Sequence, residues 1–207
     1  MDIRDFENLP IMGILRSIDY DLIDELVQTM ISSGLKTVEV AMNTSGAEKQ
    51  IRKIVEISKG CLCVGAGTVL KTDDLKKALD YGATFIVTPV LVGEVLEYCV
   101  KNSICVFPGA LTPGEIYNAW GMGATMVKVF PAKFFGPTYF KEIKGPFDRM
   151  KLLACGGVNS DNIKSFFLNG ANAVAFGGSI FRKELLESRD FLRIGENIKT
   201  LISAYKQ

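Results

Sequence analysis

Apolar and polar residues follow a regular rhythm along the whole chain. Eight short runs rich in apolar and β-branched residues recur, and between them lie longer stretches in which apolar residues return every three or four positions. Short apolar runs are typical of buried strands, and the longer period is typical of amphipathic helices. The predicted strands begin at or near Ile11, Thr37, Cys61, Phe85, Ile104, Met126, Leu152 and Ala173.

Helix boundaries are also marked in the sequence. Apolar residues at helical spacing run from Leu22 to Ile31, and Gly34 follows where a helix C-terminus favours glycine. The segment from Thr112 to Glu115 reads TPGE, which is a capping box with proline at the first helical position. A second helix is therefore expected to begin there.

Strands that alternate with helices predict a parallel sheet, and eight such units predict closure into a (β/α)₈ barrel. A doubly wound open sheet is the alternative. The 207 residues are close to the lower size limit of the barrel fold, so we expect one domain spanning residues 1–207. The segment from Asp2 to Leu9 precedes the first strand and is expected to form a short N-terminal helix over the bottom of the barrel.

Composition narrows the functional classes. The net charge is +1, and positive and negative residues are mixed along the chain, which gives no reason to expect a nucleic-acid or membrane partner. We read neither a signal peptide nor an apolar run of the roughly 18 residues needed to span a bilayer. The five cysteines are an odd number, typical of free thiols in a reducing compartment, so the predicted location is cytoplasmic.

The chain contains no histidine. This excludes serine–histidine and cysteine–histidine nucleophile pairs, and it excludes histidine-ligated metal sites. Catalysis, if any, must use lysine, carboxylate, tyrosine or cysteine side chains, or the backbone. We expect no metal and no cofactor.

One charged residue interrupts a predicted buried strand. Lys128 lies in the run MVKVFPA, and if Val127 and Val129 pack outward, strand periodicity points Lys128 into the barrel. The same argument for the strand at Thr37 points Glu39 inward. Burial among apolar walls is expected to lower the pKa of the lysine, leaving a neutral amine that can attack a carbonyl and form a Schiff base. The alternative is a purely structural ion pair.

Glycine pairs end the last two predicted strands, as Gly156-Gly157 and as Gly177-Gly178 followed by Ser179. Such turns expose backbone amides, and in many barrels the loops after these two strands bind phosphate. Together with a buried lysine, they predict a phosphorylated carbonyl compound as substrate.

In these features the chain resembles the family of 2-keto-3-deoxy-6-phosphogluconate aldolases, class I enzymes that release pyruvate and glyceraldehyde 3-phosphate without a cofactor. The resemblance covers nearly the whole chain, and several motifs occur together in order. They are GILR at Gly13–Arg16, VEV around Glu39, VGAGTVL at Val64–Leu70, FIVTPV at Phe85–Val90, FPGALTP at Phe107–Pro113, KVFPA at Lys128–Ala132 and GGVN at Gly156–Asn159.

The resemblance implies roles for individual residues. It makes Lys128 the Schiff-base lysine, which forms a covalent imine with substrate, and Glu39 the proton shuttle. The implied substrate-binding residues are Arg16, Asn43, Thr68, Pro89, Cys155, Gly156, Gly157, Gly178 and Ser179. Purely structural roles stay open for Arg16 as a solvated charge, for Thr68 as a turn cap and for Ser179 as a helix cap. A homotrimer is also implied.

Two departures from the family pattern leave the substrate open. Asn43 stands where many gluconate-type members have arginine, and Cys155 stands where many have threonine. Both favour 2-keto-3-deoxy-6-phosphogalactonate, whereas the FGGS of the last strand and the KGPF at Lys144 favour the gluconate epimer. 4-Hydroxy-2-oxoglutarate is a further candidate. Alternatives of another class are a metal-free sugar-phosphate isomerase or epimerase, and a barrel that only binds a sugar phosphate.

Overall fold

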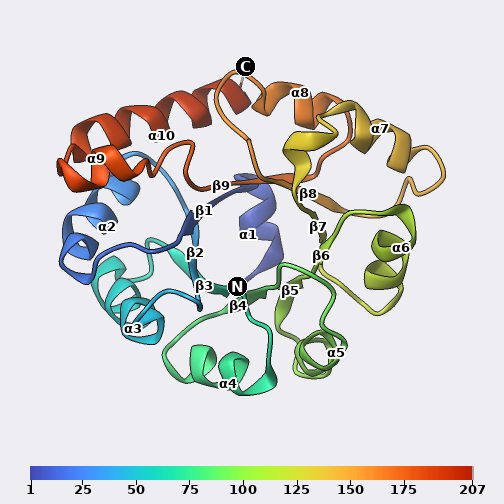
Figure 1. Ribbon diagram of the computed structural model, residues 1–207, viewed down its shortest axis with the longest axis horizontal. Helices are drawn as coiled ribbons and strands as arrows, with labels where there is room; N and C mark the ends of the chain where they lie inside the picture. The colour runs from blue at the N-terminus through green and yellow to red at the C-terminus, as the bar shows by residue number, and fades with distance from the viewer. Residues whose placement is uncertain (207) are drawn as a thin grey trace.

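The computed structural model describes residues 1–206 as a ring of parallel strands surrounded by helices (Figure 1). The strand order β5-β4-β3-β2-β1-β9-β8-β7-β6 follows the chain around the ring, as the predicted barrel requires. The strands are β1 (Ile11–Leu15), β2 (Thr37–Ala41), β3 (Cys63–Gly67), β4 (Phe85–Val87), β5 (Cys105–Phe107), β6 (Gly109–Ala110), β7 (Val127–Val129), β8 (Leu152–Cys155) and β9 (Ala173–Phe176).

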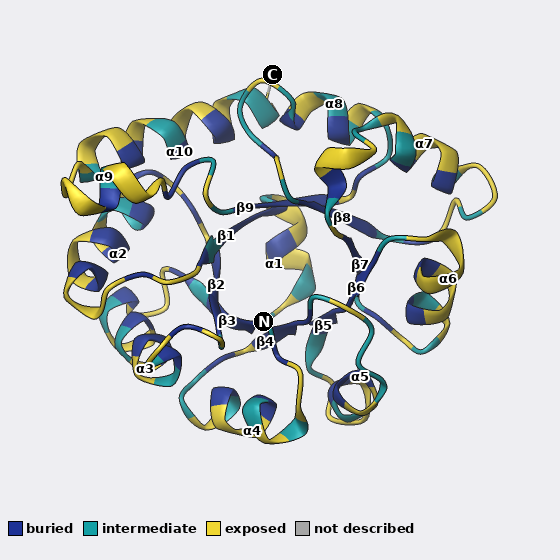
Figure 2. Ribbon diagram, in the orientation of Figure 1, coloured by how far each residue is buried: buried dark blue, intermediate teal, exposed yellow. Residues whose placement is uncertain are grey.

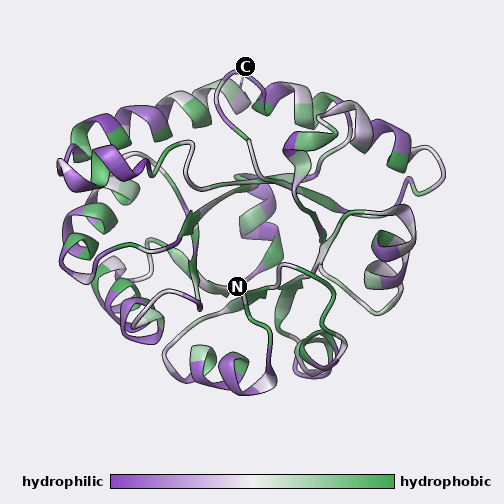
Figure 3. Ribbon diagram, viewed as in Figure 1, coloured by the Kyte–Doolittle hydropathy of each residue, from purple (hydrophilic) through white to green (hydrophobic). Residues whose placement is uncertain are grey.

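Helices cover the outside of the ring, with apolar faces toward the strands and polar faces toward solvent (Figure 3). Thr112 and Glu115 form the predicted capping box at the start of α6, and Gly34 lies just past the end of α2 with φ +86°. The α-helices are α1 (Ile3–Asn8), α2 (Ile23–Ser32), α3 (Ala47–Ser58), α4 (Thr72–Asp80), α5 (Gly93–Lys101), α6 (Pro113–Gly121), α7 (Thr138–Lys144), α8 (Ile163–Leu168), α9 (Lys183–Glu187) and α10 (Phe191–Lys206). Two 3₁₀ turns are η1 (Tyr20–Leu22) and η2 (Ala132–Phe134).

The fifth predicted strand is divided in two by Pro108, because proline has no N–H to continue a ladder. β5 pairs with β4 on one side of this break, and β6 pairs with β7 on the other. The Pro108 carbonyl accepts a hydrogen bond from the Lys128 amide at 2.8 Å. At Gly109 the backbone passes so close to Pro89 that a Cβ would lie 2.1 Å from the Pro89 carbonyl oxygen. This close approach brings the two edges of the sheet together.

The core has two layers, as strand periodicity predicts. Val38, Val40, Val127 and Val129 are buried in the layer between the strands and the helices, while the barrel interior is filled by Met12, Phe85, Phe107, Met126 and Leu153 among others. Figure 2 shows the strands of the ring coloured as buried along most of their length. Helix α1 closes the end of the barrel at the amino ends of the strands, where Phe6 packs edge-to-face on Phe107 with ring centroids 5.7 Å apart. The predicted N-terminal helix is therefore confirmed. No helix within residues 1–206 combines the length and the apolar character of a membrane span.

Candidate active site

Lys128 and Glu39 meet inside the barrel. They come from β7 and β2, which are not neighbours in the sheet, and Lys128 Nζ lies 4.0 Å from Glu39 Oε1. Both residues are buried, with 5% of Lys128 and 1% of Glu39 exposed. The predicted inward orientation of the two side chains is confirmed.

The Glu39 carboxylate has a long ion-pair contact with Lys128 but lacks the hydrogen bonds that accompany a structural ion pair. Neither of its oxygens has a hydrogen-bond partner among residues 1–206, and the Lys128 ammonium is beyond hydrogen-bond distance. Buried carboxylates that only stabilise a fold normally have their hydrogen bonds satisfied. An unsatisfied carboxylate beside a buried lysine is what a proton-transfer site needs before its substrate arrives.

Burial raises the pKa of Glu39, and the positive charges of Lys128 and Arg16 offset only part of this effect. A carboxyl whose pKa is shifted toward neutral can both accept and return a proton at working pH. The carboxylate packs directly on Gly67 at the end of β3, where a Cβ would lie 2.6 Å from Glu39 Cδ and Oε1. Gly67 therefore makes room for the carboxylate, a role that sequence reasoning did not assign to it.

A cavity of about 550 Å³ opens above the pair, at the carboxyl ends of the strands. Its lining includes Lys128, and these residues predicted to bind substrate: Arg16, Pro89, Cys155, Gly156, Gly157, Gly178 and Ser179. Two predicted residues do not line it. Thr68 lies next to it and contacts Arg16, whereas Asn43 is exposed in the turn after β2.

Arg16 follows β1, and its guanidinium donates a hydrogen bond to the Thr68 hydroxyl, with 3.1 Å between Nη2 and Oγ1. Thr68 has φ +56°, a left-handed conformation that costs a residue other than glycine about 1–2 kcal/mol. Arg16 is exposed but not free, since Thr68 orients it at the cavity wall. An oriented guanidinium of this kind can bind a carboxylate.

The glycine turns after β8 and β9 lie side by side at the rim. Gly156 and Gly157 both have positive φ, at +98° and +82°. The Ser179 hydroxyl donates to the Val158 carbonyl at 2.7 Å, so it ties the two turns together and is not available to donate to a ligand. The amides of Gly178 and Ser179 have no acceptor within the described chain, which leaves two N–H groups for an anion.

Cys155 ends β8 beside Lys128. Burial raises the pKa of its thiol, and the positive charge of Lys128 lowers it only in part, so the thiol stays neutral at physiological pH. A neutral, buried thiol shapes the cavity but is a poor nucleophile. Phe130 also lines the cavity, and its ring centroid is 5.4 Å from Lys128 Nζ, as expected from the strand alternation that points both residues inward.

Lys133 also lines the cavity, and sequence reasoning missed it. It lies in η2, beyond the end of β7, where no periodic rule says which way a side chain points. The only signal was its position just after the KVFPA motif.

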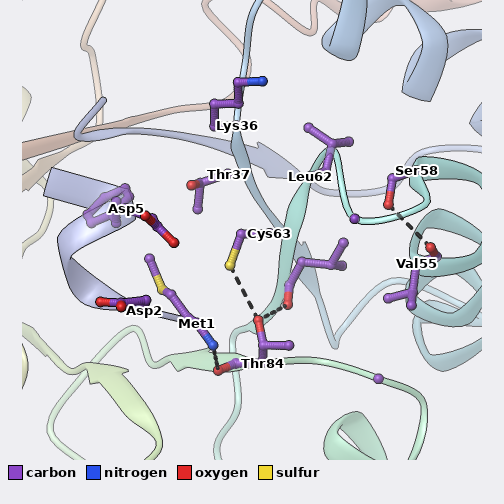
Figure 4. Close-up of a pocket in the computed structure, with 14 residues that line it drawn as sticks. Met1, Asp2, Asp5, Lys36, Thr37, Val55, Ser58, Leu62, Cys63 and Thr84 are labelled. Carbon is purple, nitrogen blue, oxygen red and sulfur yellow. Dashed lines mark hydrogen bonds between the residues drawn. The ribbon is translucent and has the colours of Figure 1, made fainter. Parts of the chain in front are cut away.

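A second cavity, of about 350 Å³, lies at the opposite end of the barrel, between α1 and the amino ends of β2 and β3 (Figure 4). Thr37, Cys63 and Thr84 point into it, with Cys63 Sγ 3.3 Å from Thr84 Oγ1. No pair of buried opposite charges lines this cavity, so it lacks the groups that distinguish the first. Among residues 1–206 no cluster of three or more cysteine, aspartate or glutamate side chains is arranged to hold a metal ion.

Comparisons with known proteins agree with this geometry. The family model described as "KDPG and KHG aldolase" matches residues 3–197. The 2-dehydro-3-deoxy-6-phosphogalactonate aldolase of Escherichia coli (strain K12) is 31% identical over 201 residues, covering 96% of each chain. The 2-dehydro-3-deoxy-phosphogluconate aldolase of Haemophilus influenzae is 30% identical, covering 99% of this chain and 96% of its own.

Solved structures give the same result. A structure described as native KDPGal superposes with a TM-score of 0.89 at 30% identity, covering 96% of this chain and 95% of its own. KDPG aldolase from Legionella pneumophila, solved with pyruvate captured as a covalent carbinolamine, superposes with a TM-score of 0.86 at 25% identity and 93% coverage of both chains.

Proposed function

The chain belongs to the family of KDPG and KHG aldolases, and from this premise we propose that it cleaves 2-keto-3-deoxy-6-phosphogluconate to pyruvate and glyceraldehyde 3-phosphate through a Schiff base on Lys128. One observation carries the proposal. The buried Lys128 amine and an otherwise unpartnered Glu39 carboxylate lie 4.0 Å apart beneath a cavity of about 550 Å³. The pair supplies both groups that the reaction requires.

The reaction begins when the Lys128 amine, in its neutral form, attacks the C2 carbonyl of the keto acid. Loss of water gives an iminium, which withdraws electrons from the neighbouring bonds. The Glu39 carboxylate takes the proton of the C4 hydroxyl, directly or through a water, as the C3–C4 bond breaks, its electron pair forms an enamine, and the aldehyde leaves. Glu39 then protonates C3 to make the methyl group, and water releases pyruvate and the free amine. The raised pKa of Glu39 suits the carboxyl group to accepting and returning a proton in these steps.

The cavity offers a place for each end of the substrate. Arg16, held by Thr68, is suited to the carboxylate next to the reacting carbonyl. The unpaired amides of Gly178 and Ser179, beside the turn at Gly157, are suited to the phosphate. Pro89 and Cys155 line the wall between them. Asn43 is assigned no direct contact, because it is exposed outside the cavity.

The galactonate epimer is the second candidate. Cys155 lines the cavity where many gluconate-type relatives have threonine, so a hydroxyl that would contact the substrate is replaced by a thiol. The two curated relatives, at 31% and 30% identity, act on different epimers by name and give no preference. 4-Hydroxy-2-oxoglutarate remains a third substrate to test, given the family to which the chain belongs.

The testing experiment compares pyruvate release from the two phosphorylated epimers and from 4-hydroxy-2-oxoglutarate at equal enzyme concentration. The proposal expects the highest kcat/KM for the gluconate epimer, and a higher value for the galactonate epimer would transfer the assignment to that sugar. If purified, folded protein released pyruvate from none of them, an isomerase or a binding barrel would replace the aldolase. The proposed homotrimer is tested separately by light scattering of the same sample.

A further inference from the structure

Three cationic side chains line the cavity above Glu39, and no carboxylate does. Two of the three are already engaged, since Arg16 bonds to Thr68 and Lys128 faces Glu39. Lys133 is the third, and its ammonium has neither a carboxylate partner nor a hydrogen bond within residues 1–206. A free cation at the rim of a positively charged cavity is placed to meet an anion.

Lys133 belongs to the side of the cavity formed by the glycine turns. The backbone of Gly157 lies so close to it that a Cβ there would be 2.6 Å from Lys133 Cβ and 3.5 Å from its Cα. The base of the lysine side chain therefore packs directly against the turn after β8. Gly156 packs less tightly on the residues before Lys133, with the Ala132 amide nitrogen 3.6 Å from the position of its missing Cβ. Arg16, which is proposed to bind the substrate carboxylate, instead lies after β1.

The ammonium is held only weakly where it is. Nζ lies 5.0 Å from the centroid of the Phe134 ring, a cation–π contact, and that ring is 71% exposed. Lys133 itself is exposed, so its flexible stem can turn toward the glycine turns without leaving a buried partner behind.

We propose that Lys133 binds the phosphate of the substrate and sets the preference of the enzyme for phosphorylated over unphosphorylated keto acids. This inference rests on the proposed aldolase function. The backbone amides of Gly178 and Ser179 can contact two oxygens of a phosphate but cannot neutralise its charge. Lys133 adds a positive charge, which attracts a phosphate much more strongly than it attracts the uncharged hydroxyl at the same end of an unphosphorylated sugar.

Arg182 is a second cation near these turns and is the alternative candidate for binding the phosphate. Arg182 Nε donates to the Ser179 carbonyl at 3.4 Å, and its side chain lies outside the cavity lining. Arg182 therefore bonds to the backbone of the turn outside this cavity, whereas Lys133 lines the cavity.

The test uses the phosphorylated keto acid that the wild type cleaves and the same acid without its phosphate. Lys133→Met removes the charge but keeps a stem to pack on Gly157, and Lys133→Arg keeps a charge. Lys141→Met, on an exposed position of α7 away from the cavity, is the matched control. Inorganic phosphate serves as a competitive inhibitor.

We expect Lys133→Met to lower kcat/KM for the phosphorylated acid about 10- to 30-fold, as for loss of a partly exposed charge-assisted hydrogen bond. The unphosphorylated acid should change less than about 2-fold, and inhibition by inorganic phosphate should weaken in parallel. Lys133→Arg should recover most of the loss, and Lys141→Met should match wild type. Equal losses on both acids, or no loss with a normal phosphate inhibition constant, would overturn the proposal.

Reductive trapping of pyruvate separates this inference from the proposed function. Pyruvate carries no phosphate, so Lys133→Met should trap it on Lys128 as the wild type does. If the wild type itself trapped no pyruvate, the aldolase assignment would fail. If both proteins trapped pyruvate and both kept the same preference for the phosphorylated acid, the role of Lys133 alone would be wrong.

Discussion

Replacement of Gly67 by alanine tests whether the position of the Glu39 carboxylate matters. The new Cβ would lie 2.6 Å from Glu39 Cδ and Oε1 and 2.9 Å from Oε2, which is well inside van der Waals contact. Because these atoms are the end of a side chain, the carboxylate moves in preference to the backbone. It must shift by about 1 Å to reach the separations of 3.5 Å or more at which carbon atoms normally pack.

We expect this displacement to lower catalytic activity more than stability. A shift of about 1 Å in a reacting group can lower the rate about 10²-fold, so we expect kcat to fall by about that factor. Overpacking of a buried site typically costs 1–3 kcal/mol, and because a side-chain end can yield here, we expect about 1 kcal/mol of stability to be lost. Formation of the imine depends on Lys128, on the other side of the barrel, and should persist.

The assay measures kcat, pyruvate trapping and the urea unfolding midpoint of Gly67→Ala in parallel. Gly114→Ala is the matched control, because a Cβ at that position in α6 meets no atom within 4 Å. The control should keep wild-type turnover and stability within about 1 kcal/mol. Wild-type kcat in Gly67→Ala would show that the position of the carboxylate does not limit the reaction. If the variant lost both its fold and its ability to trap pyruvate, Gly67 would be needed only for packing.

Two further substitutions test the electrostatics of the site. Burial raises the pKa of Glu39 above its ordinary value of 4.5, so the folded protein holds the carboxyl proton of Glu39 more tightly than the unfolded chain does. The contribution of Glu39 to stability therefore declines as the pH rises above 4.5. Glu39→Gln should remove this decline, which urea unfolding across that pH range measures, and an unchanged dependence of stability on pH would contradict the assigned pKa shift. The same variant should slow exchange of the pyruvate methyl protons at least about 100-fold. Arg16→Ala should raise KM about 10-fold with a smaller change in kcat, because the group that Arg16 is proposed to bind is the substrate carboxylate, which does not itself react. Steady-state kinetics with an unchanged KM would return Arg16 to the role of a solvated charge.

The sequence predicted the barrel because its strands and helices have separate periods that are easy to distinguish. Strand periodicity also placed Lys128 and Glu39 inside, since both lie within strands whose neighbours are buried valines. The prediction was less accurate beyond the strand ends. The family resemblance implied that Asn43 binds substrate, but β2 ends at Ala41 and the chain turns there, which leaves Asn43 exposed.

Contacts between segments distant in sequence could not be read from a local pattern. The packing of Gly67 on Glu39 depends on the register of β3 against β2, in which Gly67 pairs with Ala41. The break at Pro108 was visible as a proline, but the division into β5 and β6 depends on how the two edges of the sheet meet. The hydrogen bond from Ser179 to Val158 likewise needs the two turns to be adjacent, so only the structure shows that the hydroxyl is already engaged.

The central claim is that Lys128 forms a Schiff base, and trapping with pyruvate and borohydride tests it most directly because it requires neither the correct sugar nor turnover. Intact mass and peptide mapping should show one reduced pyruvate adduct per chain, located on Lys128, and none in Lys128→Met that is shown to be folded. An adduct on another lysine, or no adduct on folded wild-type protein at neutral pH, would contradict the account and leave the pair of Lys128 and Glu39 with another role.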